Sequence, residues 1–151
     1  MEPDRKQPDR KDSATKEAKA PEVKRRMVEP RRILVVDDDP TVRQICMRVL
    51  RSARYDTYEA SDGAAALDFV RESPEKPHLV LSDIVMPRMN GVQLLEALSV
   101  LHPGLPVLLM TGYAMDALRE QGISVPCGVL AKPFAPEHLL SEVHRCLYPL
   151  A

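Results

Sequence analysis

Polar side chains that can bind a metal ion and a phosphoryl group follow four short apolar runs of this sequence. They are Asp37 and Asp38 after residues 33–36, Asp83 after 79–82, Thr111 after 107–110 and Lys132 after 129–131. Carboxylate oxygens are ligands that suit Mg²⁺, which in proteins commonly also binds phosphate oxygens. A hydroxyl group and an ammonium group can stabilise the negative charge of a phosphoryl group. The four positions together predict a site for a divalent metal ion and for phosphoryl chemistry.

The acidic residues of this predicted site can act in two ways. Carboxylates that lie close together raise one another's pKa, so a cluster of them is best explained by a cation bound among them. One carboxylate can also attack phosphorus as a nucleophile and form an aspartyl phosphate. In that reaction a metal ion, the Lys132 ammonium group and the Thr111 hydroxyl would position the phosphoryl group and stabilise its charge.

The site requires a fold that brings the ends of these apolar runs together. Five strand-like runs alternate with segments whose apolar residues recur every three or four positions, as on one face of a helix. The strands are expected at 33–36, 55–59, 78–82, 106–110 and 129–131, and the helices begin near 40, 63, 91, 113 and 136. This alternation is typical of a doubly wound α/β fold with a parallel sheet. The carboxyl ends of such strands open onto one crevice, which would collect the four polar positions.

Four motifs of the sequence resemble the receiver domain of bacterial two-component response regulators. They are Val35–Asp38, Leu81–Gly91, Met110–Tyr113 and Lys132–Phe134, and each stands at the end of an expected strand, in the family's order. The resemblance covers about residues 31–148. It implies a flavodoxin-like sheet of five parallel strands in the order 2-1-3-4-5, flanked by five helices. The sequence around Thr111 is most similar to that of receivers attached to hybrid histidine kinases.

The resemblance also implies a role for each residue of the predicted site. Asp83 would accept the phosphoryl group. The Mg²⁺ ligands would be Asp37, Asp38, Asp83 and the backbone carbonyl of Val85, while Thr111 would act as the switch hydroxyl and Lys132 would pair with a phosphoryl oxygen. The Lys132–Pro133 peptide bond is expected to be cis. Asp39, which precedes Pro40, is expected to cap a helix and not to bind metal.

A receiver of this kind would act as a single-domain response regulator. It would take a phosphoryl group from a histidine kinase or a histidine phosphotransferase and signal to an unknown downstream protein by a conformational switch. It would not be an enzyme, except that it promotes its own phosphorylation and dephosphorylation. Many receivers have an aromatic residue three positions before the lysine, and this chain has Val129 there. Signalling to a partner protein is therefore expected to depend on movement of the backbone and helices, and not on rotation of an aromatic side chain.

Two other interpretations stay open at this point. The run Asp37–Thr41 also fits the Asp-x-Asp-x-Thr pattern of haloacid-dehalogenase-like phosphatases, in which Asp37 would be the nucleophile. Those enzymes need further acidic metal ligands after the lysine, but only Glu137 and Glu142 follow, both in the last expected helix. The chain could instead be a receiver-like module that binds a partner without phosphorylation. The complete acidic set and Lys132 argue against that interpretation.

Composition limits the remaining functions. A net charge of -1 gives no support for direct DNA binding. No apolar stretch approaches the roughly 20 residues that a membrane span requires. Three cysteines without a paired spacing argue against both a disulfide framework and a zinc site. We therefore expect a cytoplasmic protein in which Cys46 and Cys146 are small buried apolar residues.

The first part of the sequence differs from the rest. Residues 1–32 hold 11 Lys or Arg against 7 Asp or Glu, whereas the remainder holds 10 against 15. Apolar side chains are scarce before Pro30, so this segment cannot bury enough surface to offset the entropy of ordering it. The sequence therefore predicts a disordered arm at residues 1–30 and a receiver domain at residues 31–151.

Overall fold

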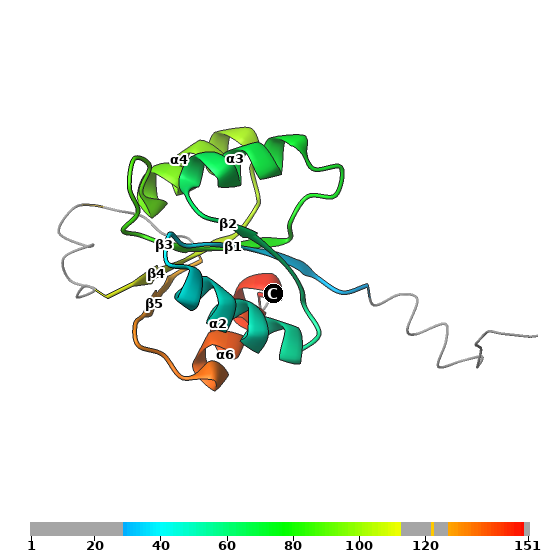
Figure 1. Cartoon of the computed structure of the whole chain (residues 1–151). Helices are drawn as coiled ribbons and strands as arrows, with labels where there is room; N and C mark the ends of the chain where they lie inside the picture. Colours follow the sequence, from blue (N-terminus) through cyan, green and yellow to red (C-terminus); the bar gives the residue numbers. More distant parts are fainter. Residues whose placement is uncertain (1–28, 113–121, 123–126, 150–151) are drawn as a thin grey trace, which may run out of the picture. The chain divides into compact units, whose positions relative to one another are not determined.

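A central parallel sheet organises the described part of the chain. The computed structural model describes residues 29–112, 122 and 127–149, and Arg31–Ala151 form one compact unit. The strands are β1 (Arg32–Val36), β2 (Asp56–Ala60), β3 (Leu79–Asp83), β4 (Val107–Thr111) and β5 (Val129–Ala131). They are parallel and hydrogen-bonded in the order β2-β1-β3-β4-β5 (Figure 1). The predicted fold class and strand order are confirmed.

Four helices of the described residues cover the two faces of the sheet. They are α2 (Pro40–Ser52), α3 (Gly63–Glu72), α4 (Gly91–Leu101) and α6 (Pro136–Leu147). Helices α2 and α6 lie on one face, and α3 and α4 lie on the other, which makes the fold doubly wound (Figure 1). The helix expected near 113–120 and the arm expected at 1–30 lie outside the described residues, apart from Glu29 and Pro30.

The apolar runs of the sequence form the strands because both faces of the sheet are covered. Successive side chains of a strand point to opposite faces. In β1, accordingly, Ile33 and Val35 pack with residues of α2 and α6, whereas Leu34 and Val36 pack with residues of α3 and α4. All four of these side chains are fully buried. A continuous apolar run is the pattern expected of such a strand, and it fixes where the polar strand ends must lie.

Three of the helices begin with a side-chain cap, in the segments that follow β1, β2 and β3. Asp39, Asp62 and Asn90 are the N-cap residues of α2, α3 and α4, and each accepts a hydrogen bond from a backbone N–H in the first turn. A cap of this kind satisfies a donor that the helix itself leaves unpaired. The prediction that Asp39 caps a helix is confirmed, with Asp39 Oδ1 2.9 Å from the Thr41 nitrogen. The Lys132–Pro133 bond is cis, as the resemblance implied.

The cysteines depart from the sequence-based prediction. Cys127, which precedes β5, is joined to Cys146 in α6 by a disulfide, with the two Cα atoms 5.7 Å apart. The argument from spacing against a disulfide is therefore wrong, because the fold brings together two residues whose spacing along the chain carries no signal. Cys146 is buried, as predicted, but as one half of this disulfide. Cys46 is free and buried, as predicted.

Among the described residues, no helix combines the length and the apolar character that crossing a bilayer demands.

Candidate functional site

The strand register brings the polar groups to one edge of the sheet. The central strand β3 pairs with β1 on one side and with β4 on the other, where Asp83 is paired with Met110. In the next pair, Thr111 of β4 is opposite Ala131 of β5. The backbone N–H of Lys132 then donates a hydrogen bond of 2.7 Å to the Thr111 carbonyl. The residues that end β3 and β4 and those that follow β1 and β5 are thus neighbours.

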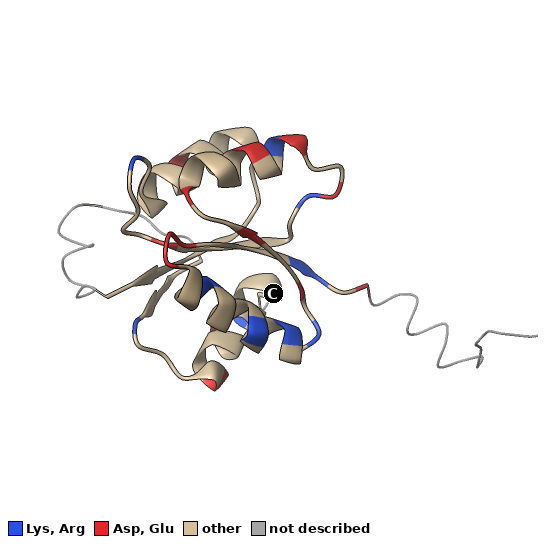
Figure 2. Cartoon of the chain, in the orientation of Figure 1, with Lys and Arg blue, Asp and Glu red and all other residues tan. Residues whose placement is uncertain are grey.

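Asp37, Asp38 and Asp83 form a compact acidic group at this edge. Figure 2 shows in red the acidic segment that connects β1 to α2. One carboxylate oxygen from each residue lies within 4.8 Å of the other two. The side chain of Asp37 is 1% exposed and that of Asp83 is 12% exposed, whereas Asp38 is open to solvent. The acidic group therefore has one open side, from which a small ion or a phosphoryl group can approach.

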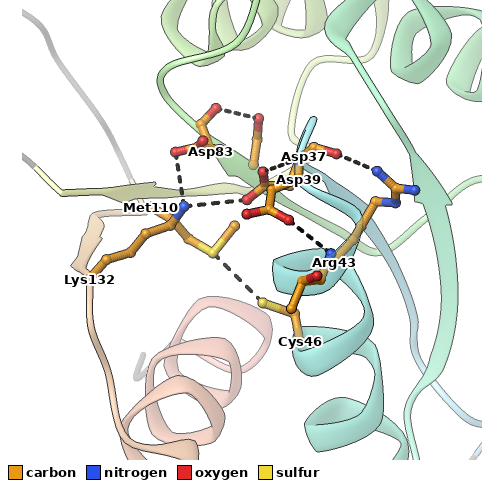
Figure 3. Close-up of polar contacts among 9 residues, drawn as sticks. Asp37, Asp39, Arg43, Cys46, Asp83, Met110 and Lys132 are labelled. Carbon is orange, nitrogen blue, oxygen red and sulfur yellow. Dashed lines mark hydrogen bonds and ion pairs between the residues drawn. The ribbon is translucent and has the colours of Figure 1, made fainter.

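Lys132 reaches this acidic group from β5. Its Nζ lies 3.3 Å from Oδ2 of Asp37 and 3.3 Å from Oδ1 of Asp83, so that one ammonium group bridges two carboxylates (Figure 3). Partial burial lowers the pKa of Lys132, but the two carboxylates outweigh burial and raise it overall. The ammonium group therefore stays charged at neutral pH.

The electrostatic environment of Asp83 is unfavourable to its carboxylate in the absence of a further cation. Its pKa is raised, chiefly because burial disfavours the charged form, and the Asp37 carboxylate adds to this. Lys132 and a hydrogen bond from the Val85 N–H lower the pKa without cancelling the rise. A cation close to Asp83 would lower this pKa by direct attraction.

The donor set fits a divalent metal ion. The acidic group has three carboxylates, and Lys132 forms ion pairs with two of them, those of Asp37 and Asp83, which leaves negative charge to be balanced. Carboxylate oxygens with an open side are the ligands that suit Mg²⁺, which keeps several waters and accepts phosphate oxygens. The acidic group is therefore consistent with a Mg²⁺ site formed by Asp37, Asp38 and Asp83.

Thr111 and Val85, the remaining residues of the predicted site, lie at the same edge. Thr111 is the last residue of β4 and is buried. Val85 stands two residues after Asp83, and its side chain is exposed, while its backbone N–H bonds the Asp83 carboxylate. The switch role of the Thr111 hydroxyl and the metal-binding role of the Val85 carbonyl stay predictions.

Arg43 is part of the site, although the sequence patterns did not indicate it. Its Nη1 donates a hydrogen bond of 2.7 Å to the backbone carbonyl of Asp37, and its Nε lies 2.7 Å from Oε1 of Glu59. The arginine side chain is 15% exposed. Arg43 therefore connects the acidic loop at residues 37–39 to strand β2. Figure 3 shows its contact with Asp37. That Arg43 and Glu59 lie close together can be recognised only when the pairing of Val35 with Glu59 is known.

Replacing Arg43 with alanine is expected to weaken Mg²⁺ binding by about 10-fold, the lower range for losing a residue that orients a metal ligand. The reason is that the Asp37 backbone loses the guanidinium group that holds it. Isothermal titration with MgCl₂ measures the change. Arg48→Ala, an exposed arginine on the same helix, is the matched control. Equal affinities in the two variants would show that Arg43 does not position the acidic loop.

Gly91 allows α4 to start against the backbone of the proposed phosphoacceptor. Its N–H donates a hydrogen bond of 2.8 Å to the Ile84 carbonyl. A Cβ atom at this position would overlap the carbonyl oxygen of Asp83 and lie 2.9 Å from the Ile84 Cα. The sequence predicted the start of a helix near this position, but not this close approach of two backbone segments.

Gly91→Ala is expected to lower the free energy of unfolding by about 1–3 kcal/mol, the usual cost of overpacking. Backbone atoms cannot move aside as a flexible side chain can, so the strain falls on the Asp83 end of β3. Urea denaturation measures this change. Gly112→Ala is the control, since a Cβ there meets nothing within 4 Å. A similar free energy of unfolding for both variants would contradict the prediction.

Comparison with known proteins identifies the family. Residues 33–144 match the family model described as the response regulator receiver domain, a span that includes every residue of the site. The chain belongs to this family. The strand order, the acidic group and the lysine that bridges two of its carboxylates are all features of this receiver domain.

Curated relatives contain similar receivers in different settings. Sensor kinase CckA of Brucella abortus is 36% identical over 116 residues, which are 76% of this chain but 12% of CckA. Response regulator MprA of Mycolicibacterium vanbaalenii is 37% identical over 121 residues, or 78% of this chain and 51% of MprA. Response regulator receiver protein CpdR of Brucella abortus is 33% identical over 118 residues, which cover 78% of this chain and 97% of CpdR. The chain therefore spans a small part of the first relative, about half of the second and nearly all of the third.

Solved structures agree with the fold. Chemotaxis response regulator CheY4 of Vibrio cholerae has a TM-score of 0.71 at 28% identity, with 79% of this chain and 100% of that one covered. The receiver domain of the hybrid histidine kinase CckA has a TM-score of 0.65 at 32% identity, with 78% and 99% covered. The receiver domain of this chain is thus similar both to a chemotaxis regulator and to a hybrid-kinase receiver.

Proposed function

We propose that this receiver domain accepts a phosphoryl group on Asp83, with Mg²⁺ as cofactor, in a two-component phosphorelay. The observation that carries the proposal is the position of the Asp83 carboxylate at the end of the central strand, among Asp37, Asp38 and Lys132. Domains of this family are typically signalling modules and not enzymes. We extend this to the present chain, which would promote only its own phosphorylation and dephosphorylation.

Each residue of the site would have its own role in the reaction. A carboxylate oxygen of Asp83 attacks the phosphorus atom of the donor, the bond from phosphorus to the leaving group breaks, and an aspartyl phosphate forms. When bound, Mg²⁺ would offset the charge of the phosphoryl oxygens. Lys132 would hold a further oxygen of the transferred group, and Thr111 would donate to another. Hydrolysis returns the Asp83 carboxylate and releases phosphate.

The donor in this proposal is a histidine kinase or a histidine phosphotransferase, because the family belongs to two-component systems. In this proposal the phosphorylated receiver signals to another protein by a conformational switch, and its similarity to the response regulator receiver protein CpdR supports a role as a response regulator. We further propose that the chain works in the cytoplasm without binding DNA directly. The arm at residues 1–30 would be dispensable for phosphorylation, since it supplies no residue of the site.

Two observations disfavour the phosphatase alternative. Glu137 and Glu142, the acidic residues after Lys132, both lie on α6, where Glu142 forms an ion pair of 2.7 Å with Arg145. The acidic group also includes Asp83, which the phosphatase pattern leaves without a role. The receiver-like binding module without phosphorylation is disfavoured by the contacts of Lys132 with both buried carboxylates.

Incubation of the chain with acetyl phosphate and Mg²⁺ tests the proposal. We expect intact mass spectrometry to show the addition of one phosphoryl group, which disappears on hydrolysis at neutral pH. A phosphorylated histidine phosphotransferase should serve as an alternative donor. No added phosphoryl group with any donor, at saturating Mg²⁺, would contradict the proposed function.

A further inference from the structure

We propose that Cys127 and Cys146 form a second modification site of this chain, a dithiol that is oxidised reversibly to a disulfide. The oxidant would be a peroxide or a small-molecule disulfide. Oxidation would covalently join the entry of β5 to the end of α6, and reduction would release them. This proposal does not depend on phosphorylation at Asp83.

The fold holds the two cysteines together by contacts that do not involve a sulfur–sulfur bond. Nη2 of Arg145, the residue before Cys146, donates a hydrogen bond of 2.7 Å to the Cys127 carbonyl and forms an ion pair with Glu142. The same nitrogen lies so close to Gly128 that a Cβ there would meet it at 2.9 Å. The thiols would therefore stay close in the reduced protein, which is the condition for a bond that can form repeatedly.

The backbone separation suits a disulfide, and the pair can be reached from solvent. The two Cα atoms are 5.7 Å apart, within the usual range of 4.4–6.8 Å. Cys127 is partly exposed, whereas Cys146 is 9% exposed. Both residues line a groove of about 450 Å³ that also includes Leu105 and Pro106 before β4. Exposed disulfides are the ones that thiol reagents reduce most easily.

The third cysteine supplies an internal reference. Cys46 is fully buried in α2, and burial, with a contribution from Asp37, raises the pKa of its thiol to about 11. The thiolate is the reactive form of cysteine, so Cys46 should be inert toward oxidants. Any oxidation of cysteine in the folded protein should therefore fall on Cys127 and Cys146.

The oxidation balances in two steps. The Cys127 thiolate attacks one oxygen of the peroxide, the O–O bond breaks, and a sulfenic acid and one water molecule result. Cys146 sulfur then attacks the sulfenic sulfur, the S–O bond breaks, and a second water molecule leaves. Two thiols have lost two electrons and two protons, and the peroxide has been reduced to water. A dithiol reductant reverses the bond by thiol–disulfide exchange.

Counting thiols in the full chain tests the proposal. The reduced protein is treated with hydrogen peroxide while folded, then denatured and alkylated, and its intact mass is measured. We expect three alkylated cysteines before peroxide, one after it, and three again when the folded oxidised protein is treated with glutathione. Cys46→Ser should keep the bond, Cys127→Ser should abolish it, and Asp83→Asn should behave as the unmodified chain. Three alkylated cysteines after peroxide would overturn the proposal. Failure of glutathione to restore the thiols would overturn its reversibility.

Thermal unfolding provides a second readout. The bond closes a segment of 19 residues, and constraining the unfolded chain in this way should raise the Tm of the oxidised form by roughly 5–10 °C. Cys127→Ser should show no change of Tm with peroxide. Equal Tm values for the oxidised and reduced forms of the unmodified chain would show that the bond does not stabilise the folded domain, and would overturn this part of the proposal.

Discussion

Replacing Asp83 with asparagine is expected to abolish phosphorylation by acetyl phosphate. Asparagine keeps nearly the same shape but has no carboxylate oxygen that can attack phosphorus. Asp83 ends the fully buried strand β3, and its carboxylate lies 3.3 Å from the Lys132 ammonium group, so asparagine leaves the end of this central strand without a nucleophile. Intact mass spectrometry after incubation with acetyl phosphate and Mg²⁺ should show no phosphoryl group on Asp83→Asn.

Two further variants separate this result from a loss of fold or from a different nucleophile. Asp39→Asn removes an acidic residue of the same loop that caps α2, and it should retain phosphorylation. Asp37→Asn should still form the adduct at a reduced rate, since Asp37 is proposed as a metal ligand. Incorporation that persists in Asp83→Asn but is lost in Asp37→Asn would favour the phosphatase mechanism with Asp37 as nucleophile.

Removing Mg²⁺ is expected to have the second largest effect. With EDTA in place of MgCl₂, phosphorylation should fall to the background level, because three carboxylates balanced by one ammonium group repel an anionic donor. Asp38→Asn should weaken Mg²⁺ binding by more than the roughly 10-fold expected for a residue outside the metal ligands. Isothermal titration and the mass of the phosphorylated chain measure the two effects.

The matched control for Asp38→Asn is Asp56→Asn. Asp56 is an exposed acidic residue at the start of β2, at the opposite end of the sheet, and its replacement changes net charge by the same amount. Mg²⁺ affinity should be unchanged in this variant. If Asp38→Asn binds Mg²⁺ as tightly as Asp56→Asn does, Asp38 is not a ligand. Phosphorylation in EDTA at the rate seen with Mg²⁺ would show that the cation is not required.

The sequence was sufficient for the sheet and for the acidic group because both depend on local patterns. A strand covered on both faces must be apolar throughout, so the runs before Asp37 and Asp83 could be recognised directly. Arg43 and Gly91 could not, since each acts through the backbone of a residue on another element. The pairing of Cys127 with Cys146 likewise depends on where α6 meets the entry of β5. Spacing along the chain carries no information about such contacts.

The bridge that Lys132 makes between Asp37 and Asp83 has a consequence for the signal itself. Three carboxylates, one ammonium group and a divalent cation would form an electroneutral site. An aspartyl phosphate carries about two negative charges where the carboxylate carried one, so the phosphorylated site would be anionic. Hydrogen-bond donors near the site would then be attracted to the excess negative charge. The backbone N–H of Lys132 is bonded to the Thr111 carbonyl. A shift of the ammonium group toward the phosphoryl oxygens would therefore pull on the ends of β4 and β5 together.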